Sequence, residues 1–123
     1  MPSQSFPKAR RIRRRDEFKQ VFDSGLRTHG RFMTVLMAPG VTGTSRLGIV
    51  ASRKLGDAVH RNKAKRLIRE AFRKAFPLPG RPDVDLVVIP RREVFTAAYP
   101  NFETDFLSTV KRCSARLPAD GSR

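Results

Sequence analysis

The sequence contains few of the residues on which several classes of protein depend. Cysteine occurs once, as Cys113, which excludes an internal disulfide and fits a reducing compartment. Histidine occurs twice, as His29 and His60, and two histidines without a companion cysteine make no recognisable zinc site. No apolar run is long enough to cross a membrane, and the basic first residues lead into no apolar signal-peptide segment. We therefore expect a cytoplasmic protein that has no membrane partner and no metal site of its own.

Acidic residues are also scarce. The chain has 11 Asp and Glu against 26 Lys and Arg, which gives a net charge of +15 at neutral pH. Charge of one sign opposes compaction unless a polyanion neutralises it, so nucleic acid is the favoured partner and an anionic membrane a distant second. The acids are scattered and Cys113 has no obvious histidine partner, so no acid/base pair or nucleophile stands out. We predict no catalytic residue in the protein and no small-molecule substrate.

The residues that are present predict one small α+β domain over residues 1–123. A length of 123 residues seldom supports two cores, while 39% hydrophobic residues and nine phenylalanines suffice for one. Hydrophobic periodicity, caps and Pro/Gly stops predict a sheet packed with helices, in the order α-β-β-α-β-α. The expected elements are a helix over 16–24, a hairpin of strands 32–38 and 46–52, a long helix over 58–76 capped by Asp57, a strand over 84–89 and a helix over 101–115. We expect order over about 13–115, with a mobile basic arm (1–12) and a mobile tail (116–123).

The long helix carries the strongest functional signal. Its apolar residues fall on one arc, at Ala64, Leu67, Ile68, Ala71, Phe72 and Ala75, which marks the core face. Beside this arc, Arg61, Lys65, Arg69 and Arg73 form an i, i+4 ridge, with Asn62 and Arg66 next to it. Such a face on an arbitrary helix is more often simply solvated. Seven Lys or Arg within residues 61–74 exceed what solubility requires, so the helix is predicted to bind phosphate.

The segment from Leu55 to Arg69, which reads LGDAVHRNKAKRLIR, resembles the signature of bacterial ribonuclease P proteins. The resemblance extends from about residue 13 to residue 110 through three further stretches: DEFKQVF (16–22), LGIVASRK (47–54) and DLVVIPR (85–91). It implies a fold with a left-handed βαβ crossover. It also implies that the protein is the non-catalytic subunit of an endoribonuclease, in which the catalytic RNA subunit cleaves precursor tRNA with Mg²⁺ held mainly by that RNA.

The resemblance further implies two RNA-binding surfaces. Contacts with the catalytic RNA are expected at Arg61, Asn62, Lys63, Lys65, Arg66, Arg69 and Arg73. A cleft that receives the 5′ leader of precursor tRNA is expected at Phe18, Phe22, Leu36, Ser52, Arg53, Lys54 and Arg91. Taken alone, Phe18 and Phe22 are more often core residues than platforms for bases.

Three other functions are compatible with parts of the sequence. A general RNA-binding or ribosomal protein accounts for the charge but not for the signature of the long helix. An autonomous nuclease needs acid/base residues that the chain does not offer. A DNA-binding helix-turn-helix needs a partner helix across a short turn, whereas the long helix is flanked by predicted strands.

Overall fold

The computed structural model describes residues 8–40, 42–78 and 83–117. Their elements are three short 3₁₀ helices, three α-helices and four strands. In chain order they are η2 (Lys8–Arg10), α1 (Arg15–Ser24), β1 (Leu26–His29), β2 (Met33–Pro39), β3 (Arg46–Ile49), η3 (Arg53–Leu55), α2 (Ala58–Ala75), β4 (Val84–Pro90), η4 (Arg92–Phe95) and α3 (Tyr99–Arg116). None of the helices in this described part is long and apolar enough to span a membrane.

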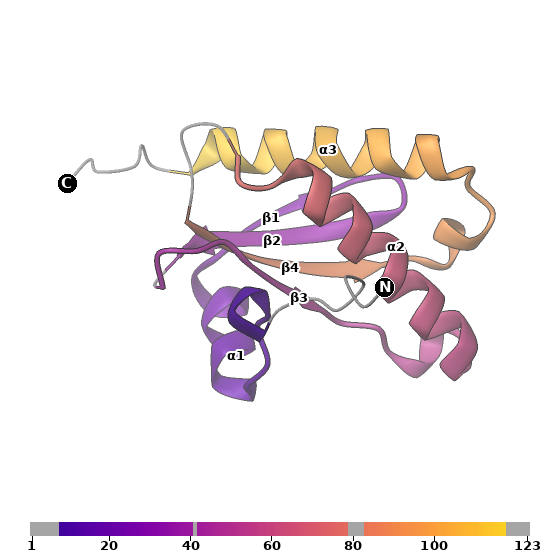
Figure 1. Cartoon of the computed structure of the whole chain (residues 1–123), viewed down its shortest axis with the longest axis horizontal. Helices are drawn as coiled ribbons and strands as arrows, with labels where there is room; N and C mark the ends of the chain where they lie inside the picture. Colours follow the sequence, from indigo (N-terminus) through magenta and orange to yellow (C-terminus); the bar gives the residue numbers. More distant parts are fainter. Residues whose placement is uncertain (1–7, 41, 79–82, 118–123) are drawn as a thin grey trace.

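The four strands form one mixed sheet in the order β1-β2-β4-β3. β2 pairs antiparallel with β1 and β4, whereas β3 and β4 are parallel, so α2 connects two parallel neighbours. Helices α2 and α3 cover one face of the sheet and α1 covers part of the other (Figure 1). The small α+β class predicted from the sequence is confirmed. The left hand of the crossover stays an implication of the family resemblance.

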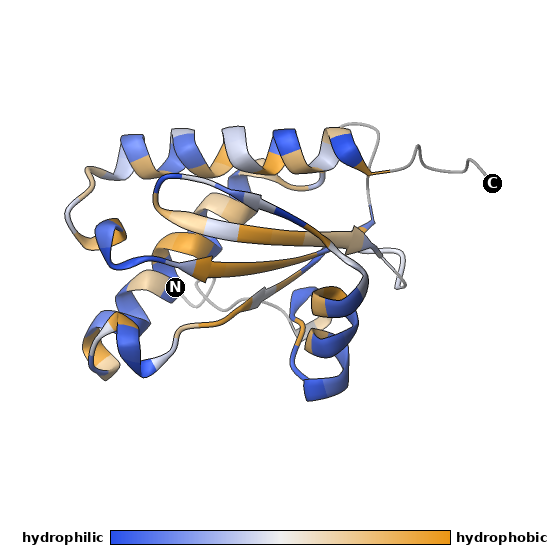
Figure 2. Cartoon of the chain, turned by 180° about the vertical axis from the view of Figure 1, so that it is seen from behind, coloured by the Kyte–Doolittle hydropathy of each residue, from blue (hydrophilic) through white to orange (hydrophobic). Residues whose placement is uncertain are grey.

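Each face of the sheet has its own apolar cluster. On one face, alternate residues of β2 and β4, such as Met33, Val35 and Leu86, pack against α2 and α3. On the other, Leu36 and Val87 pack against Val21 of α1 and against Ile12. The central strands β2 and β4 are therefore buried on both sides, which explains their nearly continuous apolar sequences. Figure 2 shows the hydrophobic residues gathered in these strands and on the inner side of α3.

The predicted hairpin is wrong. Strand β4 lies between β2 and β3, so the two segments that were expected to pair are not neighbours. The neighbours of β2 are β4 on that side and, on its other edge, β1, a four-residue strand of sequence LRTH that was not predicted. Its single buried residue, Thr28, gives no hydrophobic alternation to recognise. The observed order is therefore α-β-β-β-α-β-α.

Packed residues extend beyond the expected range at both ends. Ile12 is buried and its N–H donates to Leu47 O at 2.9 Å, while Arg11 bridges to Leu47 in parallel register. Residues 11 and 12 therefore contact the sheet, because one apolar residue anchors the basic segment, and the mobility of the arm stays a prediction. At the other end α3 continues to Arg116, followed by buried Leu117. The rest of the predicted arm and tail, 1–7 and 118–123, lies outside the described residues.

Candidate nucleic-acid interface

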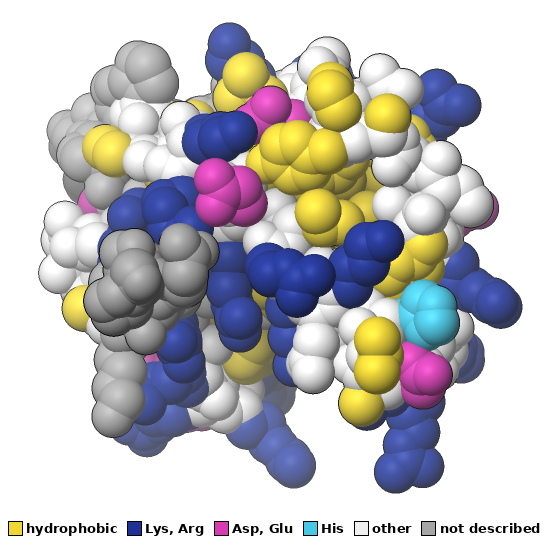
Figure 3. All heavy atoms as spheres, turned by 45° about the vertical axis from the view of Figure 1, so that its right-hand side comes forward, with side chains coloured by type: hydrophobic (Ala, Val, Ile, Leu, Met, Phe, Trp, Pro, Cys, Tyr) yellow, Lys and Arg dark blue, Asp and Glu magenta, His cyan; other side chains and the backbone are white. Residues whose placement is uncertain are grey.

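Helix α2 presents the predicted division into an apolar and a basic face. Ala64, Ile68, Ala71 and Phe72 are buried, and Asp57 caps the helix by accepting the His60 N–H at 3.0 Å. Asn62, Lys63 and Arg66 are exposed, whereas the ridge of Arg61, Lys65, Arg69 and Arg73 is half-buried along its edge. Figure 3 shows how Lys and Arg side chains dominate the surface of this side of the molecule around a hydrophobic patch. The helix can therefore offer several cations to one polyanion at once.

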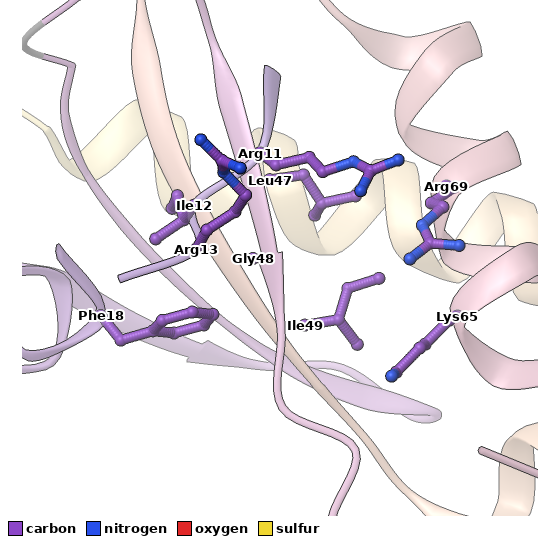
Figure 4. Close-up of a pocket in the computed structure, with 9 residues that line it drawn as sticks. All are labelled: Arg11, Ile12, Arg13, Phe18, Leu47, Gly48, Ile49, Lys65 and Arg69. Carbon is purple, nitrogen blue, oxygen red and sulfur yellow. The ribbon is translucent and has the colours of Figure 1, made fainter. Parts of the chain in front are cut away.

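A small cavity joins α2 to the segment that precedes α1. Its volume is about 190 Å³, and β3 forms its floor at Leu47, Gly48 and Ile49. Arg11 and Arg13 enter from the N-terminal segment, Lys65 and Arg69 point into it from α2, and Phe18 of α1 lies on the opposite side (Figure 4). We call this cavity the basic pocket. It connects a residue predicted to bind the leader with residues predicted to bind the catalytic RNA.

The basic pocket has an unbalanced positive charge. None of its nine lining residues is acidic. Burial lowers the pKa of Arg69, and the nearby guanidinium groups of Arg11 and Arg73 lower it further. Nε of Arg11 is buried without a hydrogen-bond partner among the described residues. An anion in the pocket would relieve the repulsion between these cations, so the pocket suits a phosphate group.

Helix α1 places two phenylalanines beside the sheet. Phe18 packs over Gly48, where a Cβ atom would lie only 2.7 Å from the Phe18 ring, so the ring requires a glycine at that position. Phe18 is partly buried together with Val50 and Ile89, while Phe22, one helical turn further on, is 38% exposed. Phe18, Val50 and Ile89 therefore share one partly exposed apolar cluster, and Phe22 adds an exposed ring on the same helix, so both rings are accessible to a base.

The other predicted cleft residues divide into accessible and inaccessible ones. Ser52, Arg53 and Lys54 are exposed where β3 leads into α2. Leu36 is only 1% exposed beneath α1, so the expectation that it lines the cleft is wrong. It lies in the apolar cluster with Val21 and Val87 because the pleat of β2 directs it toward the helix. Arg91 is half-buried and bonded to the β1–β2 turn and to Thr34.

Four candidate functional residues were not predicted from the sequence. Arg11 was assigned to a mobile arm, Arg13 was given no functional role, and Val50 and Ile89 were predicted only as parts of strands. The alternation of β4, in which Asp85, Val87, Ile89 and Arg91 share a face, carries the signal for Ile89. No signal in the sequence locates Arg11 beside Arg69, because that contact depends on tertiary structure. Within the described segments, no group of three or more His, Cys, Asp and Glu is arranged to hold a metal ion.

A buried ion-pair cluster fixes α1 to the sheet. Arg46 of β3 binds Asp85 of β4 through Nε and Nη2 at 3.0 and 2.9 Å, and its Nη1 lies 3.0 Å from Glu17 Oε2. The other oxygen of Glu17 accepts the N–H groups of Arg13 and Arg14, each at 3.1 Å. One arginine therefore links two strands, the first turn of α1 and the segment that lines the basic pocket.

Glu17 makes the folded state sensitive to acid. Burial tends to raise its pKa, but the Arg14 N–H, the Arg46 guanidinium and the Arg13 N–H outweigh burial and lower the pKa from 4.5 to about 2. Because the pKa is lower in the folded state, the stabilisation is complete above about pH 4.5 and is lost as the pH falls toward 2. We expect the free energy of unfolding, measured in urea, to fall more steeply from pH 5 to pH 2 for the natural protein than for Glu17→Gln. If the free energy of unfolding fell equally with pH in the natural protein and in Glu17→Gln, this prediction would be contradicted.

Comparison with known proteins assigns the chain to a family. The family model described as Ribonuclease P matches residues 6–114. The chain is 39% identical over 92 residues to the ribonuclease P protein component of Thermotoga petrophila, which covers 75% of this chain and 78% of the relative. It is 37% identical over 122 residues to that of Petrotoga mobilis, covering 94% of this chain and 100% of the relative.

Solved structures agree with this assignment. The fold matches the ribonuclease P protein of Thermotoga maritima with a TM-score of 0.73 at 36% identity, over 83% of this chain and 96% of that one. It matches a Staphylococcus aureus RNase P protein, a mutant with defective mRNA degradation activity, with a TM-score of 0.77 at 29% identity, over 87% and 90% of the two chains. The chain therefore belongs to the ribonuclease P protein family.

Proposed function

We propose that the protein is the non-catalytic subunit of a ribonuclease P ribonucleoprotein, which binds the catalytic RNA and the 5′ leader of precursor tRNA. In this role it promotes endonucleolytic removal of the leader. The catalytic RNA holds the Mg²⁺ ions that activate water for phosphodiester hydrolysis. The protein supplies cations that reduce repulsion between the two RNA molecules and an apolar surface that favours precursor over product.

The observation that carries this proposal is the continuity of two surfaces. The basic pocket contacts Phe18 on one side and Lys65 and Arg69 of α2 on the other. A single-stranded leader whose bases stack on Phe18 and Phe22 would bring its phosphates toward Arg11 and Arg13. The catalytic RNA would meet Arg61, Asn62, Lys63 and Arg66 on the exposed side of α2. Stacking accepts every base, which suits a leader of variable sequence.

The proposal is tested by reconstitution. Cleavage of a precursor tRNA is measured at low Mg²⁺ and near-physiological salt with the protein alone, the catalytic RNA of the same organism alone, and both together. We expect efficient cleavage at the mature 5′ end only from the mixture. An unchanged RNA activity on adding protein would instead favour a general RNA-binding role, and cleavage by the protein alone would favour a nuclease.

Phe22→Ala tests the cleft within the same system. Because Phe22 is 38% exposed and lies outside the fully buried core, its removal should lower the unfolding temperature only modestly, and affinities are compared where both proteins are folded. Loss of one stacked base costs about 1–3 kcal/mol, so affinity for precursor tRNA should fall by roughly 5- to 150-fold. Affinity for tRNA without a leader should not change. Leu107→Ala, on α3 at the other face of the sheet, is the matched control. An equal loss for both tRNA substrates would show that Phe22 does not contact the leader.

A further inference from the structure

One row of residues on the α1 face of the sheet lies beside the two phenylalanines. The register pairs His29 of β1 with Thr34 of β2, and Thr34 with Ile89 of β4. Val50 adjoins Ile89, because its N–H donates to Val88 O at 3.0 Å. Paired residues of a sheet share a face, so these four side chains point to the side on which α1 lies. The preceding row, which includes Leu36 and Val87, is the one that α1 covers.

The guanidinium group of Arg91, beside this row, is not free to bind a phosphate through two nitrogens. Its Nη1 donates to the carbonyl oxygens of Gly30 and Arg31. Its Nη2 lies 3.0 Å from Thr34 Oγ1 and 3.3 Å from His29 Nδ1. Each terminal nitrogen of arginine carries two hydrogens, so these four contacts use all of them. A two-pronged bond from Arg91 to phosphate would require breaking contacts that hold the β1–β2 turn.

The same contacts favour one tautomer of the His29 ring. Its Nδ1 also lies 2.9 Å from Thr34 Oγ1. Arginine can only donate, so the contact with Arg91 is a hydrogen bond in the tautomer whose Nδ1 carries the lone pair and whose hydrogen is on Nε2. The His29 side chain is exposed. In this tautomer it presents an N–H donor on an accessible ring.

The backbone that carries His29 is held from the other face of the sheet. Asp105 of α3 accepts the N–H groups of Arg31 and Phe32 at 3.1 and 3.0 Å. Arg112 of α3 donates to His29 O at 3.4 Å. A Cβ atom on Gly30 would lie 2.3 Å from Thr109 Oγ1, so the turn packs closely on α3. A donor fixed in this way loses little entropy when it binds a ligand.

We propose that His29 is a specificity contact for single-stranded RNA, in which Nε2–H donates to an acceptor on the edge of a leader base. The proposal deepens the function proposed above and rests on it. The Nε2–H donor of this tautomer suits a base acceptor, whereas the exposed Arg27, one row away, suits a phosphate. Arg91 then acts as a positioning residue that selects the tautomer of His29.

The test is a titration of the reconstituted holoenzyme with precursor tRNA and with the same tRNA lacking its leader, at several salt concentrations. His29→Ala should lower the affinity gained from the leader by about 2- to 10-fold, the size expected for one neutral hydrogen bond. The slope of log affinity against log salt should not change. His29→Gln keeps an acceptor and a donor and should retain more affinity than His29→Ala. His29→Phe keeps a flat ring without nitrogen and should lose as much as His29→Ala.

Arg27→Ala is the matched control for charge. It should make the salt slope shallower by about 0.7, as expected for one phosphate contact on a single strand. A similar change of the salt slope in His29→Ala would mean that His29 contacts a phosphate and would overturn the inference. Full affinity of His29→Phe for precursor tRNA would mean that the ring stacks on a base, which would also overturn it. An equal loss of affinity in His29→Gln and His29→Ala, or no loss in His29→Ala, would overturn the inference as well. If the natural protein gains no affinity from the leader, the proposed function itself fails, so the two failures are distinguishable.

Discussion

Replacing Arg46 by methionine should lower the free energy of unfolding by about 3–5 kcal/mol, because the substitution leaves a buried carboxylate without its partner. The side chains of Arg46 and Asp85 are only 9% and 7% exposed. Methionine fills much of the space of the aliphatic part of the arginine side chain. The lost charge, not a cavity, therefore accounts for most of the expected decrease in the free energy of unfolding. The measurement is equilibrium unfolding in urea at neutral pH.

Two further variants separate the buried charge from other causes. In Arg46→Met with Asp85→Leu, both partners become apolar, and most of the lost stability should return. Arg14→Ala removes an exposed pair with Asp16, whose side chains are 75% and 70% exposed, and should change stability by less than about 0.5 kcal/mol. A change of that small size in Arg46→Met would mean that the cluster does not hold α1.

Neutralising the basic pocket should have the largest effect on RNA binding. In Arg11→Gln, Lys65→Gln, Arg69→Gln, three cations are lost and no negative charge is added. Each phosphate contact releases counterions, so the slope of log affinity against log salt should become shallower by about 2–3. The loss of affinity for RNA, summed over the catalytic RNA and the leader of precursor tRNA, should therefore be greatest at low salt and shrink as salt increases.

The same variant makes an opposite prediction for the free protein. Arg11 and Arg69 line the same pocket, and burial, followed by the charges of Arg11 and Arg73, lowers the pKa of Arg69. Without RNA, the triple variant should unfold at an equal or higher temperature than the natural protein, and added phosphate should stabilise it less. Lys111→Gln, at an exposed position on α3, is the control. An unchanged salt slope in the triple variant would exclude phosphate from the pocket.

The sequence by itself determined the elements whose signals are local. The Asp57 cap, the apolar arc through Ala64 and Phe72, and the stop after Phe76 lie within one helix, so periodicity and capping sufficed to predict α2. The same periodicity identified the basic ridge beside the core face. The apolar run of β4 was also recognisable, since a strand buried on both faces needs no alternation.

Only the tertiary structure decided which segments are neighbours. The turn residues between β2 and β3 favour a hairpin, but β4 inserts between these strands because pairing on both edges buries its apolar run. Strand β1 has one buried residue and exists because β2 and α3 hold it. Ile12 is a single apolar residue among arginines, so its burial, and with it the position of Arg11, could not be read from composition.

The functional surfaces follow the same division. The ridge of α2 is a property of one helix, so the sequence located it. The basic pocket and the row through His29 bring together residues from the N-terminal segment, all four strands and two helices. Their geometry depends on strand order, on the pleat that buries Leu36, and on the Arg46 cluster that fixes α1. These are long-range contacts, whose free energy depends on the whole fold and not on any local pattern.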